Sequence, residues 1–70
     1  MKLHITTTRD NRTTKSIRGN SKKVEGWDII DRLAELNDLS TYEFCTRFNP
    51  RVYERHVEIP VEQIDALKIA

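Results

Sequence analysis

The chain has 70 residues and a net charge of +1, with 33% charged and 37% hydrophobic residues. A chain this short makes one domain, residues 1–70, and buries only about 60% of its unfolded surface. Its single cysteine, Cys45, excludes an internal disulfide, and together with the separated His4 and His56 it cannot build a zinc site. No apolar run reaches the roughly 18 residues of a membrane span, and no signal sequence opens the chain, so we expect a cytoplasmic protein that does not bind membranes.

The charges divide the chain into a basic and an acidic part. Residues 1–23 carry seven basic residues and one acid, whereas residues 24–70 carry five basic residues and ten acids. This asymmetry indicates binding to a charged partner, which could be a protein, a nucleic acid or a second copy of the chain in a homodimer.

The first expected element is a β-hairpin formed by residues 2–8 and 13–18. Apolar and polar residues alternate in the first segment, and Asp10-Asn11-Arg12 is a turn signal. A three-residue loop at 10–12 would place Arg9 opposite Thr13 and Ile5 opposite Ile17, with both isoleucines on the core face.

The next element is an amphipathic helix over residues 23–38, around which we expect the chain to fold. Its apolar residues recur at helical spacing, and Ser21 is a candidate N-cap. Gly26 weakens the first turn and makes the start of the helix uncertain. Trp27 is the largest apolar side chain, so it is expected in the core.

Two interpretations compete for residues 40–48. Tyr42, Phe44 and Phe48 alternate with other residues, which favours a strand. Ser40 and Glu43 instead form the capping box of a short helix, which Pro50 would stop. In that alternative, residues 37–43 resemble the inter-helix turn of ribbon-helix-helix repressors, and the resemblance implies DNA binding. We predict the strand.

The remaining chain predicts a fourth strand and a short helix. Residues 52–59 place Tyr53, Val57 and Ile59 on one face, and Pro60 suits the first position of a helix over 61–68. We therefore predict an α+β domain in the order ββαββα. Its four-stranded, mainly antiparallel sheet packs on the central helix 23–38, with a short C-terminal helix at one edge.

Two charged clusters are candidate binding sites. An acidic ridge, spaced three, four and three residues apart along one helix face, would bind a basic protein surface; it comprises Asp28, Asp31, Glu35 and Asp38. A solvated helix face is its ordinary alternative. The basic residues of the hairpin region would neutralise phosphates of a nucleic acid, or would only protect a sheet edge; they are Arg9, Arg12, Lys15, Arg18, Lys22 and Lys23.

Nothing in the sequence predicts an enzyme, a cofactor or a metal site. The chain is too short for a substrate pocket, and the acids lack the turn geometry of a calcium loop. We expect a small regulatory or inhibitory protein, of the kind common in phages and mobile elements, that binds a protein partner. The alternatives are a nucleic-acid-binding module that uses the basic hairpin and a structural subunit of a larger assembly.

Overall fold

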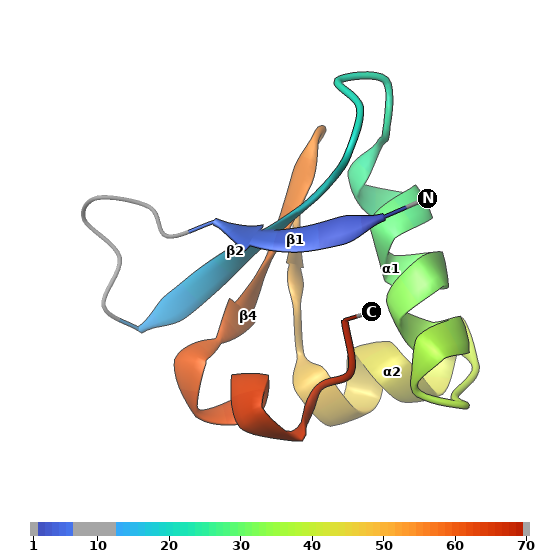
Figure 1. Ribbon diagram of the computed structural model, residues 1–70. Helices are drawn as coiled ribbons and strands as arrows, with labels where there is room; N and C mark the ends of the chain where they lie inside the picture. The colour runs from blue at the N-terminus through green and yellow to red at the C-terminus, as the bar shows by residue number, and fades with distance from the viewer. Residues whose placement is uncertain (1, 7–12, 70) are drawn as a thin grey trace.

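The computed structural model describes residues 2–6 and 13–69 of the chain (Figure 1). Four strands, two α-helices and one 3-10 helix follow one another along the chain: β1 (Leu3–Thr6), β2 (Thr14–Gly19), α1 (Gly26–Leu36), α2 (Thr41–Phe48), β3 (Arg51–Val52), β4 (His56–Pro60) and η1 (Val61–Ala66). The strands form one sheet in the order β1-β2-β4-β3, and every neighbouring pair is antiparallel. The predicted α+β class and four-stranded antiparallel sheet are confirmed.

The predicted register of the first hairpin is also correct. Ile5 lies opposite Ile17 in the β1–β2 pair, and Ile17 lies opposite Val57 in the β2–β4 pair. Ile17 and Val57 are completely buried, whereas Ile5 is 41% exposed because β1 is an edge strand. The predicted pairing of Arg9 with Thr13 falls partly outside the described residues.

Both α-helices cover one face of the sheet, so the core lies between the helices and that face. α1 packs against β2, β3 and β4, and α2 runs across its lower end (Figure 1). The buried apolar residues are Leu3, Ile17, Ile29, Ile30, Leu33, Ala34, Phe44, Phe48, Val57, Ile59 and Leu67. The prediction that Trp27 belongs to this core is wrong, because its side chain is 57% exposed.

The predicted strand at 42–48 is also wrong, because residues 41–48 form the helix α2. Ser40 caps it by accepting a hydrogen bond from the backbone N–H of Glu43 at 3.1 Å, as the capping box required. Phe44 and Phe48, one helical turn apart, are buried with ring centroids 4.8 Å apart. The alternation of aromatic residues predicted a strand wrongly because Tyr42, the first of the three, does not share their buried face and is 80% exposed.

The strand predicted over 52–59 is instead a hairpin of two strands, β3 and β4. The N–H of Tyr53 donates to the carbonyl of His56 at 2.9 Å and closes the turn between them. Tyr53 therefore leaves the core face and stacks its ring on that of His56, with centroids 4.6 Å apart. After Pro60 the chain forms a 3-10 helix rather than the predicted α-helix, and Leu67 follows it into the core.

The central helix begins three residues later than predicted, at Gly26 rather than 23, and it ends at Leu36. The backbone N–H of Glu25 donates to the Asp28 carboxylate at 3.3 Å, so this pair rather than Ser21 caps the helix. Gly26 is buried against the β3–β4 turn and donates its N–H to the Glu54 carbonyl at 3.0 Å. A Cβ there would overlap the carbonyl oxygen of Tyr53. The glycine permits this close approach, which fixes the position of the helix and of Trp27.

Candidate functional site: an acidic helical surface and a basic pocket

The acidic ridge predicted from the sequence lies on the solvent side of the helical layer. All four of its residues are exposed, three of them on α1 and Asp38 just after it. Arg32, one turn after Asp28, is the basic residue within this stretch and contacts Glu35 at 3.4 Å. Because one arginine accompanies four carboxylates, the ridge has a net negative charge.

Two exposed aromatic side chains adjoin this ridge, one on each helix. Trp27 precedes Asp31 by four residues on α1, so the two lie on the same side of the helix. The Asp31 carboxylate accepts a hydrogen bond at 2.9 Å from the hydroxyl of Thr41, which is the first residue of α2. Tyr42 follows Thr41 directly. Asp31 thus connects the part of α1 that carries Trp27 to the part of α2 that carries Tyr42.

We call this region the aromatic–acidic surface. It comprises the acidic ridge, which includes Asp31, and the two exposed rings of Trp27 and Tyr42. Exposed tryptophan and tyrosine are enriched at protein interfaces, where their rings fill pockets of a partner. The sequence predicted the acidic residues of this surface. It missed both aromatics, because it placed Trp27 in the core and Tyr42 in a strand with Phe44 and Phe48.

The neighbouring Cys45 is not prepared for nucleophilic chemistry. Desolvation by burial raises the pKa of its thiol, and the negative charge of Asp31 raises that pKa further. A thiol is reactive as the thiolate, so a raised pKa lowers its reactivity at neutral pH. Within residues 2–6 and 13–69, no three His, Cys, Asp or Glu side chains gather in the way that a metal ion needs.

The described residues of the predicted basic cluster divide between the two faces of β2 and the loop that follows it. Arg18 and Lys15 are three positions apart on β2 and therefore point to opposite faces of the sheet. Lys15 is on the core side, where it lies opposite the buried Ile59 and is half-buried. Lys22 and Lys23 are exposed in the loop between β2 and α1. Arg9 and Arg12 lie outside the described residues, as does the whole predicted loop 10–12.

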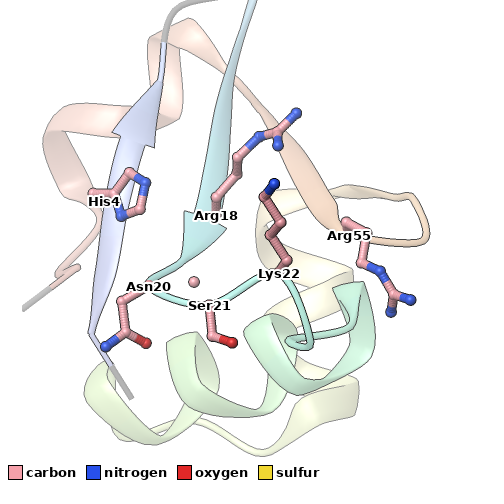
Figure 2. Close-up of a pocket in the computed structure, with 7 residues that line it drawn as sticks. His4, Arg18, Asn20, Ser21, Lys22 and Arg55 are labelled. Atoms are coloured by element: carbon pink, nitrogen blue, oxygen red, sulfur yellow. The ribbon is translucent and has the colours of Figure 1, made fainter.

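Arg18 and Lys22 line an open pocket of about 480 Å³ beside the ends of β1 and β2 (Figure 2). His4 of β1 and Arg55 of the β3–β4 turn complete its basic lining, and residues 19–21 also line it. His4 lies opposite Arg18 in the strand register, and His56 follows on the other side of Arg18. Sequence reasoning missed His4 and Arg55, although the predicted hairpin register already paired His4 with Arg18.

No known family matches the sequence, and no curated protein or solved structure shows significant similarity to the chain. Among the helices described here, none combines the length and the apolar character that a membrane crossing needs.

Proposed function

We propose that this protein is a small, non-enzymatic regulator or inhibitor in the cytoplasm that binds a protein partner through the aromatic–acidic surface. The observation that carries the proposal is the exposure of Trp27 and Tyr42, 57% and 80%, on two helices that Asp31 joins. Leaving such large rings in water forgoes burial that would stabilise a small domain, so their exposure favours a role in binding.

The charge around the two rings indicates the chemistry of the partner. The acidic ridge would attract a basic protein surface and steer its approach, while the rings would supply apolar contact area at the centre. A nucleic-acid duplex does not suit this surface, because its phosphates would meet carboxylates. The partner is therefore expected to present basic side chains around one or more apolar pockets.

The rings occupy positions where they can be removed without unfolding the protein. α1 keeps its buried face of Ile29, Ile30 and Leu33, and α2 keeps Phe44 and Phe48. Trp27 and Tyr42 stand at the second position of their respective helices, outside these apolar stripes. A double substitution of the rings should therefore reduce binding more than it reduces folding.

The test is affinity capture from a cell lysate, with and without nuclease treatment, using the wild type and Trp27→Ala/Tyr42→Ala. Tyr53→Ala is the matched control, because it removes a 42% exposed ring that stacks on His56 and is not part of the aromatic–acidic surface. We expect a protein that the wild type and the control retain and that the double variant loses. Its binding should weaken as salt rises, since charges attract it.

Two results would contradict the proposal. Equal capture by all three proteins would show that the rings do not bind the partner. Loss of every captured species after nuclease treatment would show that nucleic acid, not protein, is the partner. Thermal melts of the three proteins separate loss of binding from loss of folding.

A further inference from the structure

The basic pocket lies on the side of the sheet that the α-helices do not cover. The helix-facing side carries Ile17, Val57 and Ile59, which are completely buried. Strand alternation places Arg18, His56 and Arg51 on the opposite side. The two faces of the sheet therefore separate an acidic helical layer from a surface that carries several basic side chains.

The two cations that the pocket holds most directly have no carboxylate partner. Arg18 and Lys22 form no ion pair within the part of the chain that the structure describes. Figure 2 shows their side chains extending in the same direction, while the Arg55 guanidinium points away from them. Arg55 itself lies 3.7 Å from the exposed Glu54. The positive charges of Arg18 and Lys22 repel each other, and an anion bound between them would relieve that repulsion.

Glu58 is the acidic residue of the described strands that lies nearest to Arg18 and His56, and its carboxylate already contacts other side chains. Glu58 accepts a hydrogen bond from the Thr14 hydroxyl at 2.9 Å and lies 3.7 Å from Nε2 of His56. No acidic residue lines the pocket itself. Residues 19–21 also line the pocket, but the side chains of Asn20 and Ser21 point away from those of Arg18 and Lys22 (Figure 2), so the two cations would hold the phosphate.

We infer that this pocket binds a phosphate group in the backbone of a nucleic-acid duplex. Arginine and lysine neutralise phosphates, and contacts of this kind supply most of the sequence-independent affinity for nucleic acid. A duplex fits better than a single strand, because no large aromatic ring lines the pocket to stack on an unpaired base. The acidic ridge would turn the helical layer away from the duplex. This inference does not rest on the proposed protein-binding function.

The experiment measures binding of the full chain to a fluorescent DNA duplex by anisotropy at several salt concentrations. The pocket variant is Arg18→Gln/Lys22→Gln. The control, Arg47→Gln/Lys68→Gln, changes the net charge equally at exposed positions that do not line the pocket. Each lost phosphate contact should lower the slope of log affinity against log salt by about 0.9, and the pocket holds one phosphate, so the pocket variant should lose about 0.9.

We expect the pocket variant to weaken binding by the same factor for two unrelated duplex sequences, since phosphate contacts carry no sequence information. The control should keep the wild-type slope. The inference would be overturned if no duplex bound the wild type, if both variants lost slope equally, or if a single strand of the same length bound more tightly.

A second arm distinguishes a duplex backbone from free phosphate. Inorganic phosphate is titrated into the isotope-labelled protein while amide signals of residues 19–21 are followed by NMR. Shifts with phosphate but no binding of duplex would overturn the assignment to nucleic acid. Shifts with both ligands, abolished together in the pocket variant, would support it. Melts of each variant confirm that loss of binding is not loss of fold.

Discussion

For the substitution Gly26→Ala, helix propensity predicts a more stable protein and the structure predicts a less stable one. Alanine is favoured over glycine inside a helix by about 1 kcal/mol, so propensity alone predicts a more stable α1. In the fold, the added Cβ would overlap the carbonyl oxygen of Tyr53 and lie 2.9 Å from Cγ1 of Val52. A backbone carbonyl cannot rotate away, so either the helix or the β3–β4 turn must move.

The expected loss of stability follows from these contacts. Overpacking costs about 1–3 kcal/mol, and weakening the hydrogen bond from Gly26 to Glu54 costs about 1 kcal/mol more. After the propensity gain, we expect the free energy of unfolding to fall by about 1–3 kcal/mol. In a domain of this size that lowers Tm by roughly 5–20 °C, measured by circular dichroism.

The control for this substitution introduces a glycine where the backbone needs one. Asp38 has φ of 55°, a left-handed conformation that glycine adopts at lower cost than a residue with a Cβ. Asp38→Gly should therefore leave Tm unchanged or raise it. A Tm for Gly26→Ala at or above that of the wild type would refute the close packing of α1 on the turn.

Four further outcomes are expected. Trp27→Ala should cost only about 1–2 kcal/mol of stability in denaturant unfolding, because a fully buried ring would cost about 3–5 kcal/mol and more than half of this one is exposed; a larger loss would contradict its exposure. Asn37→Ala should cost about 1–2 kcal/mol and speed amide exchange at Lys68, because the Asn37 side chain bonds the Lys68 backbone N–H and C=O at 2.9 and 3.0 Å; unchanged exchange would refute this tie. Iodoacetamide should modify Cys45 slowly at neutral pH and faster in Asp31→Asn, because removing the negative charge lowers the raised pKa of the thiol and increases the thiolate fraction; equal rates would contradict the effect of Asp31. If copies associate through opposite charges, light scattering should show a dimer that dissociates as salt rises; a mass independent of salt and concentration would exclude that mode.

The sequence predicted the sheet better than the segments that connect it. A three-residue turn and one apolar position per strand were sufficient to pair Ile5 with Ile17, since a slip by one residue would have turned one of the two isoleucines to the opposite face of the sheet. At 40–48 two local signals conflicted. The capping box at Ser40 was correct, and the alternation through Tyr42 was a coincidence of three aromatic positions.

Side-chain size is a poor guide to the core of this domain for a related reason. Trp27 was assigned to the interior because it is large, although its position on the helix relative to Ile29 and Ile30 was already known. The decisive contact, Gly26 against the β3–β4 turn, joins residues far apart in the sequence. Local patterns carry no information about such a contact. The separation of Lys15 from Arg18, in contrast, follows from strand alternation and could have been predicted.

The most direct test of the proposed function is an NMR footprint of the isotope-labelled protein in a nuclease-treated cell lysate. If the aromatic–acidic surface binds a protein, amide signals around Trp27, Asp31 and Tyr42 should broaden and those of Gly19 and Ser21 should stay sharp. Trp27→Ala/Tyr42→Ala should restore sharp signals. Broadening confined to the basic pocket, or none on α1 and α2, would contradict the account.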